Sequence, residues 1–295
     1  MNIIVVFHCI HVNLPPVPLP SCILRALALL LLALPLARLF GEDTSASLLR
    51  IERLPDGTRY ALIGARPERP APTLFVLQGE IDVARREPIY TEVARLLALH
   101  GFISVILDAP GHGEDQRPGE PPDLASWNWR VNQGQDLIGG FVARAKAVLD
   151  HLIQEKISDP DKVAACGTSR GGFLAFQLAA HEPRIRCVGG IAPVTDLLAL
   201  REFNATTNRA AADTLALANL APRLAGRPVW ISIGNNDARV STDAAIALSR
   251  ALVACAPPDR EIVPVELLVN AGPGHRSSVQ DHERLAVWLR AQFDR

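Results

Sequence analysis

The chain has 295 residues, which is enough for one large α/β domain or two small ones. Its 30 basic and 31 acidic residues nearly cancel, which argues against binding to nucleic acid through a basic surface. The five cysteines show no spacing typical of a metal site or a redox motif, and a disulfide framework is not expected.

Residues 1–44 differ in composition from the rest of the chain and are predicted to be a signal peptide or another leader. The uncharged apolar run at 26–37 is short for a membrane span but suits the apolar region of a signal peptide. The apolar stretch before Arg25 is unusual there and indicates a start codon placed too far upstream. A membrane anchor or a buried helix is the alternative. We therefore favour an exported protein, periplasmic or secreted, over a cytoplasmic or membrane-anchored one.

Strand and helix patterns alternate from residue 45 onward. Residues 47–67 predict two strands joined by a turn at Pro55, Asp56 and Gly57, because glycine tolerates positive φ. Apolar runs predict further strands at 71–80, 102–115, 162–167, 185–196, 228–237 and 262–275. Helical spacing predicts helices at 88–101, 135–156, 171–183, 242–256 and 279–293.

The predicted strands are apolar on both faces, which is typical of a mostly parallel sheet covered by helices. No repeat or linker divides the chain, so we predict one domain over residues 45–295. Residues 197–224 depart from the alternation and are a candidate small lid. Open sheets of this kind bind ligands beyond the carboxyl ends of their strands.

One serine stands at a strand-to-helix junction in the sequence GTSRGG, between Gly167 and Gly171. This arrangement, Gly-x-Ser-x-Gly, is the nucleophile elbow, a turn so sharp that the positions two residues before and after Ser169 must lack side chains that would collide. The motif is short enough to occur by chance, and a tight structural turn is the alternative. The strand before it and the helix after it favour the elbow.

A serine hydroxyl needs a base to take its proton, and in this architecture the histidine follows the serine in the chain. Three histidines lie downstream of Ser169. His181 belongs to the helix after the elbow, and His282 lies among polar residues of the last helix, which indicates a solvated face. His275 ends the last strand in a loop of small residues and is the predicted base, although an ordinary loop histidine is the alternative.

The acid that orients the histidine is predicted to be Asp237, which closes the strand before the one that leads to His275. Asp196 closes the preceding strand and is the alternative. Asp243 is better explained as a first-turn residue of the helix that begins near Thr242.

Attack on a carbonyl creates an oxyanion, which two backbone N–H groups must stabilise. One is predicted to belong to Arg170, the residue after the serine. The other is predicted to belong to Glu80, because Gly79 allows a close turn after the strand at 71–80.

Together these residues resemble the α/β-hydrolases, in the branch of the prolyl oligopeptidase-like and dienelactone hydrolase-like proteins. The resemblance covers residues 45–295 and rests on four motifs in order: DAPGHGED (108–115), GTSRGGF (167–173), GNNDARV (234–240) and GPGH (272–275). It implies an α/β-hydrolase fold with a mostly parallel central sheet and helices on both faces.

The resemblance also implies Ser169 as nucleophile, Asp237 as acid and His275 as base, with Glu80 and Arg170 as amide donors. The sequence departs from the family in two respects. Gln78 stands where a histidine is more usual, and the chain has no room for the propeller domain of true oligopeptidases, which counts against cleavage of long or folded peptides.

Two further groups have alternative interpretations. Asp108, His112 and Asp115 have the residue types of a metal site, but the resemblance implies that they shape the loop. Trp127 and Trp129 lie near the mouth of the predicted site, where they line a pocket or, as the favoured alternative, pack a cap helix. No nucleotide-binding glycine pattern is present.

The sequence thus predicts a carboxylesterase-like serine hydrolase that cleaves an ester or a similarly activated carbonyl, with no metal or organic cofactor. Its expected partner is a small ester or peptide-like substrate, not nucleic acid, and a membrane is involved only through an uncleaved leader. A small peptidase or amidase of the same fold, and a non-catalytic binding protein on that fold, are the alternatives.

Overall fold

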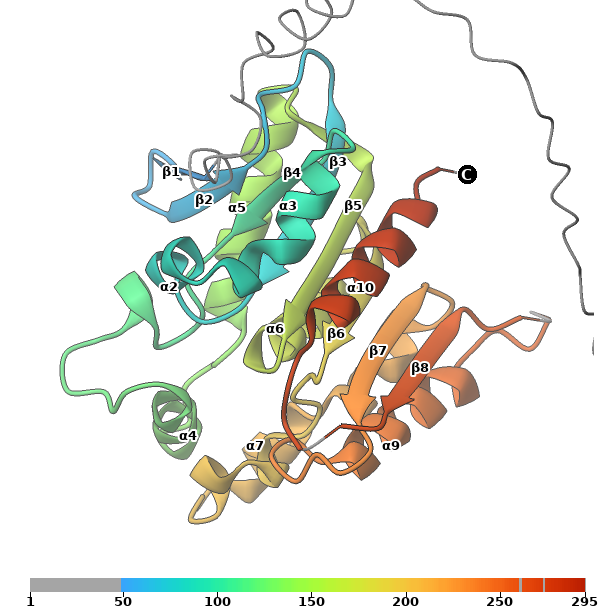
Figure 1. Cartoon of the computed structure of the whole chain (residues 1–295). Helices are drawn as coiled ribbons and strands as arrows, with labels where there is room; N and C mark the ends of the chain where they lie inside the picture. Colours follow the sequence, from blue (N-terminus) through green and yellow to red (C-terminus); the bar gives the residue numbers. More distant parts are fainter. Residues whose placement is uncertain (1–48, 260–261, 273, 295) are drawn as a thin grey trace, which may run out of the picture. The chain divides into compact units, whose positions relative to one another are not determined.

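The computed structural model describes residues 49–259, 262–272 and 274–294, so the predicted leader lies outside the described residues. In this part of the chain one sheet has the strand order β1-β2-β4-β3-β5-β6-β7-β8 (Figure 1). The pairs β1–β2 and β2–β4 are antiparallel, and every other pair is parallel. The strands are β1 (Leu49–Arg53), β2 (Arg59–Ile63), β3 (Ala71–Leu77), β4 (Ile103–Ile106), β5 (Ser158–Thr168), β6 (Ile185–Ile191), β7 (Val229–Gly234) and β8 (Val265–Asn270).

Helices cover both faces of the sheet. Helices α3 and α10 pack on one face and α5, α6 and α9 on the other (Figure 1). The helices are α2 (Ile81–Arg86), α3 (Glu92–Ala98), α4 (Leu124–Asn132), α5 (Gly139–Gln154), α6 (Arg170–His181), α7 (Arg209–Thr214), α8 (Ala221–Leu224), α9 (Thr242–Ala254) and α10 (Val279–Ala291). None of the described helices has the length and apolar character needed to cross a membrane.

Alternation along the central strands explains why both faces need a cover. In β3, Phe75 and Leu77 point to the layer of α5 and α6, while Leu74 and Val76 point to the layer of α3 and α10. All four side chains are buried. Each central strand therefore contributes to two hydrophobic layers, as the apolar runs in the sequence predicted.

The predicted order of strands and helices is confirmed, with local differences. Helix α5 begins at Gly139 rather than 135, because the Asp136 carboxylate accepts the backbone N–H groups of Ile138 and Gly139 and holds the preceding residues in a turn. The predicted helix at 88–101 is a 3-10 turn, η2 (Pro88–Thr91), followed by α3. Helix α2 was not predicted, since six residues are too few to show a helical period.

The region predicted as a lid, residues 197–224, is a series of short helices: η4 (Leu197–Ala199), η5 (Arg201–Phe203), α7, η6 (Leu217–Leu220) and α8. Helix α4 is tied to it by Asn132 and by Asn208, whose side-chain amide donates to the carbonyl of Val131 at 3.2 Å. The Oδ1 of Asn132 accepts the hydroxyl of Thr206 at 2.8 Å and the backbone N–H of Thr207 at 2.9 Å.

The strand order places a switch point between β3 and β5. The chain moves from β3 outward to β4, then returns to the other side of β3 to form β5. The loops that leave the carboxyl ends of β3 and β5 therefore diverge from neighbouring positions, where open α/β sheets bind their ligands.

Candidate active site

Ser169 occupies the turn between β5 and α6 in a strained backbone conformation. Its φ is 54° and its ψ is −118°, values that a residue with a side chain rarely adopts. Its N–H donates to the carbonyl of Ile191 on β6 at 2.9 Å, and its carbonyl accepts the N–H of Val194 at 3.0 Å. These bonds hold the strained turn, which is the elbow that the sequence predicted.

The glycines of the motif are required by backbone contact. A Cβ on Gly171 would lie 1.8 Å from the carbonyl oxygen of Leu77 at the end of β3, and one on Gly167 would lie 2.3 Å from the carbonyl carbon of Gly171. The start of α6 thus rests directly on the ends of β3 and β5. No side chain fits between them.

The structure brings Ser169, His275 and Asp237 into one continuous line of hydrogen bonds. The Oγ of Ser169 is 3.0 Å from the Nε2 of His275, and the Nδ1 of the same ring is 2.8 Å from Asp237 Oδ2. A carboxylate only accepts, so Nδ1 carries the proton. In the neutral ring Nε2 therefore presents its lone pair to the serine hydroxyl.

The Asp237 carboxylate is fully buried and has a partner on each oxygen. Its Oδ1 accepts the backbone N–H groups of Arg239 at 2.9 Å and Val240 at 3.1 Å, while Oδ2 accepts the imidazole. The two backbone bonds to Oδ1 fix the orientation of the carboxylate, so that Oδ2 faces the Nδ1 of His275.

The alternative acids have other roles. The Asp196 carboxylate accepts the N–H of Leu198 and starts η4. Asp243 lies in the first turn of α9, as predicted, after the N-cap Ser241. In the described part of the chain, neither forms a hydrogen bond or an ion pair with His275.

The two other downstream histidines also bond elsewhere. The Nδ1 of His181 bonds the carbonyl of Gln177 one turn earlier in α6. His282 was predicted on a solvated face, and that prediction is wrong: the residue is 3% exposed and its Nδ1 bonds the carbonyl of Ser278. It lies on the buried stripe of α10, where tertiary packing overrides the polarity of its sequence neighbours.

The sequence analysis missed Asp281, which supports the loop that carries His275. This buried carboxylate accepts the hydroxyl of Ser232 at 2.7 Å, the amide of Asn270 at 3.0 Å and the hydroxyl of Ser278 at 2.7 Å. It therefore ties β7, the end of β8 and the start of α10 together. The spacing Ser278-x-x-Asp281, a capping box, was the available signal.

The predicted oxyanion donors, the N–H groups of Glu80 and Arg170, begin α2 and α6, and both residues line the cavity beside Ser169. Gln78, which departs from the family pattern, donates its side-chain amide to the carbonyl of Glu80. The loop is held from the other side by Asp108, whose Oδ1 accepts the N–H of Ile81 at 2.8 Å.

The cavity around Ser169 has a volume of about 520 Å³ and is also lined by Arg201 and Glu202 of η5. Neither Trp127 nor Trp129 is among the described residues that line this cavity. Trp127 is fully buried, packs against Phe173 and donates its Nε1–H to a backbone carbonyl of the loop after β4. Trp127 thus packs helix α4 against α6, which was the favoured interpretation.

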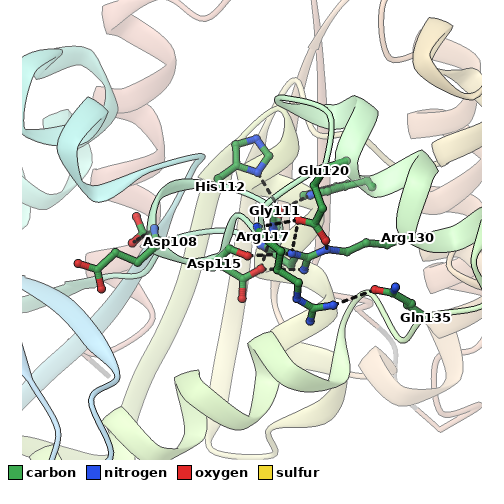
Figure 2. A network of polar contacts seen from close by, with 12 residues as sticks. Asp108, Gly111, His112, Asp115, Arg117, Glu120, Arg130 and Gln135 are labelled. Carbon is green, nitrogen blue, oxygen red and sulfur yellow. Dashed lines mark hydrogen bonds and ion pairs between the residues drawn. The ribbon is translucent and has the colours of Figure 1, made fainter.

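A buried ionic network shapes the loop after β4 (Figure 2). Arg130 of α4, which is 3% exposed, binds both oxygens of Glu120 at 2.8 Å and the Oδ2 of Asp115 at 2.7 Å. The same Oδ2 accepts the N–H of Gly111 at 2.7 Å. The network folds residues 111–120 back onto α4.

The alternative metal site is not supported. Asp108 binds backbone N–H groups, Asp115 binds Arg130, and the Nδ1 of His112 bonds the carbonyl of Pro110. In the part of the chain that the structure describes, no group of three His, Cys, Asp or Glu residues is arranged to hold a metal ion.

Comparisons with known proteins agree with this architecture. The sequence profile of the prolyl oligopeptidase family matches residues 90–295. No curated protein matches the chain by sequence. Among solved structures, TT1662 from Thermus thermophilus is similar at 22% identity, with a TM-score of 0.60 over 82% of this chain and 97% of that one.

Two further solved structures have the same fold. A puromycin-hydrolyzing peptidase of Mycobacterium tuberculosis has 18% identity and a TM-score of 0.60, over 86% of this chain but only 40% of that one. Acetyl xylan esterase 1 from Thermoanaerobacterium has 17% identity and a TM-score of 0.57, over 82% of this chain and 86% of that one. The predicted α/β-hydrolase fold is confirmed.

Replacing Gly171 by alanine should destabilise the protein, because the new Cβ meets backbone that cannot rotate away. We expect the free energy of unfolding in urea to fall by about 1–3 kcal/mol. Gly140→Ala is the matched control: it lies in the first turn of α5 with nothing within 4 Å of its Cβ position, so it should be neutral or slightly stabilising. Equal effects of the two changes would contradict the close approach.

Removing the charge of Glu120 should also destabilise the fold, because it leaves the buried Arg130 guanidinium partly uncompensated. We expect Glu120→Gln to lower the free energy of unfolding by about 3 kcal/mol. Hydrogen bonds from Arg130 lower the pKa of Glu120. The difference in free energy of unfolding between the wild type and the variant should therefore be largest above the ordinary pKa of a glutamate. It should shrink as the pH falls through the lowered pKa that Glu120 has in the folded state.

The matched control for this change is Glu155→Gln. Glu155 pairs with Arg66 at 3.7 Å, and both side chains are exposed. Its loss should cost less than about 1 kcal/mol at every pH. A loss in Glu120→Gln as small as in the control would show that the buried network does not stabilise the loop.

Proposed function

Because the chain belongs to the prolyl oligopeptidase family, we propose that this serine hydrolase cleaves an ester or a similarly activated carbonyl through an acyl-enzyme formed on Ser169. The observation that carries the proposal is the line of hydrogen bonds from Ser169 through His275 to Asp237, at 3.0 and 2.8 Å. These are the separations that proton transfer to a general base requires.

In the first step the Oγ of Ser169 attacks the carbonyl carbon while the Nε2 of His275 takes the hydroxyl proton. The imidazolium that forms is stabilised by the Asp237 carboxylate at Nδ1. The carbonyl oxygen becomes an oxyanion, and the N–H groups of Glu80 and Arg170 are proposed to stabilise it by donating hydrogen bonds.

Collapse of the tetrahedral species breaks the bond to the leaving group, which receives its proton from Nε2 of His275. A water molecule then attacks the acyl group on Ser169, with the same nitrogen taking the proton of the water. Return of that proton to Oγ releases the acid and restores the enzyme. Every proton passes through one ring nitrogen, so the position of His275 controls both halves of the reaction.

The likeness to a solved esterase supports an ester as the substrate. Acetyl xylan esterase 1 shares the fold at 17% identity over 82% of this chain. The family match favours a second candidate, cleavage of a small peptide or amide. Arg201 and Glu202 line the cavity, which supports the proposal that residues 197–224 act as a lid.

Labelling with a fluorophosphonate tests the nucleophile. We expect one adduct, located on Ser169 by peptide mass mapping, and its loss in both Ser169→Ala and His275→Ala. Turnover of a short p-nitrophenyl ester should fall by roughly 10⁴-fold or more in Ser169→Ala with the fold intact. A folded wild-type protein that takes up no label would instead favour a non-catalytic binding protein.

A comparison of two substrates with the same acyl group separates an esterase from a peptidase. We expect kcat/KM to be far higher for a p-nitrophenyl ester than for the matching p-nitroanilide, because the anilide has the poorer leaving group. An anilide that is hydrolysed as fast as the ester would favour the peptidase or amidase.

A further inference from the structure

The side chain of Arg170, the residue after Ser169, lies back over the loop that follows β3. A Cβ placed on Gly79 would be 3.8 Å from the Nη1 of Arg170 and 3.5 Å from the Cδ2 of His112. The side chains of Arg170 and His112 thus both lie next to the backbone of Gly79. This position matters because Gly79 directly precedes Glu80, the other proposed oxyanion donor.

The Arg170 guanidinium is bound by two partners from the segment between β4 and α4. Its Nη1 donates to the Nε2 of His112 and, at 3.0 Å, to the Oδ1 of Asp123. His112 is 2% exposed, and its Nδ1 is 2.8 Å from the carbonyl oxygen of Pro110. A carbonyl only accepts, so Nδ1 carries the proton and Nε2 is left as the acceptor for Arg170.

This contact requires a neutral imidazole at position 112. A protonated ring would direct an N–H at the guanidinium, which has no acceptor. Burial lowers the pKa of His112, and the charge of Arg170 acts in the same direction. The bond to the Pro110 carbonyl and the charges of Asp123 and Glu80 oppose the shift but do not reverse it.

Asp123 is held in an unusual conformation at the N-terminus of α4. Its φ is 54° and its ψ is −142°, close to the strained values of Ser169 itself. Such a conformation costs on the order of 1–3 kcal/mol and is retained where the surroundings require it. Here it turns an exposed carboxylate onto Arg170, to which it is joined at 3.0 Å.

We propose that Arg170, His112 and Asp123 form a clamp that fixes the backbone N–H of Arg170 and the loop of Glu80 relative to each other, so that the two donors stay aimed at one oxyanion. The proposal rests on the proposed function and assigns all three side chains as positioning residues. His112 acts as a permanent acceptor and not as a base.

The experiment compares the rate of fluorophosphonate labelling in the full-length wild type and in Arg170→Met. The phosphonyl oxygen occupies the oxyanion site during attack, so misplaced donors slow the reaction. We expect labelling to be roughly tenfold to a hundredfold slower, less than the 10²–10³ typical for complete loss of one donor. For a p-nitrophenyl ester the loss should appear in kcat, with KM nearly unchanged.

Arg186→Met is the matched control, since Arg186 is an exposed arginine near the amino end of β6, at the opposite end of the sheet. It should label at the wild-type rate. Circular dichroism and the urea midpoint show whether each variant is folded, and Arg170, being partly exposed, is replaced without loss of core packing.

Two variants of His112 separate positioning from general support of the fold. His112→Leu removes the acceptor and should slow labelling as Arg170→Met does. His112→Gln keeps an acceptor near the position of Nε2 and should recover most of the rate. If His112→Leu does not fold, Arg170→Met decides alone.

The proposal is overturned if Arg170→Met labels at the wild-type rate, if its loss appears as a raised KM with an unchanged kcat, or if His112→Gln is no better than a folded His112→Leu. A raised KM would make Arg170 a substrate-binding residue instead. A folded wild type that does not label at all would refute the proposed function, and the clamp with it.

Discussion

The close approach of α6 to the end of β3 is the constraint on which the rest of the site depends. Because Gly171 lies against the carbonyl of Leu77, the helix begins directly at the sheet and the preceding turn has no room to relax. Ser169 is therefore forced to a φ of 54° and its hydroxyl is exposed beyond the strand ends. The same contact brings the loop after β3 beside the start of α6, where both proposed oxyanion donors lie.

Buried charge holds the other side of that loop. The Arg130 network folds residues 111–120 onto α4, and from the start of the same loop Asp108 binds the N–H of Ile81. Replacing a buried ion network with apolar side chains often costs no stability. The network is therefore better explained by the loop geometry that it defines, since an apolar core would not fix the positions of individual N–H groups in this way.

The sequence predicted what local patterns encode and missed what packing decides. Apolar runs and glycines locate the strands and the elbow, and the chain order of the strand ends brings Ser169, Asp237 and His275 together. The burial of Trp127 against Phe173 of α6 agrees with the favoured interpretation, whereas the apolar neighbours of α10 bury His282 despite its polar sequence context. Both residues lie at helical spacing from the other buried positions of their helices. For these two side chains, that spacing predicts burial better than the polarity of the residue does.

Two arginine–glutamate pairs near the site differ in how completely they are hydrogen-bonded. Arg130 binds both oxygens of Glu120, whereas Arg239 binds one oxygen of Glu202, at 2.8 Å. The other oxygen of Glu202 and the Nη1 of Arg239 are buried without a hydrogen-bond partner among the described residues. Each such atom costs about 1–3 kcal/mol. The network around the oxyanion loop is thus fully paired, whereas the ion pair between η5 and the loop after β7 leaves one polar atom of each partner without a hydrogen bond among the described residues.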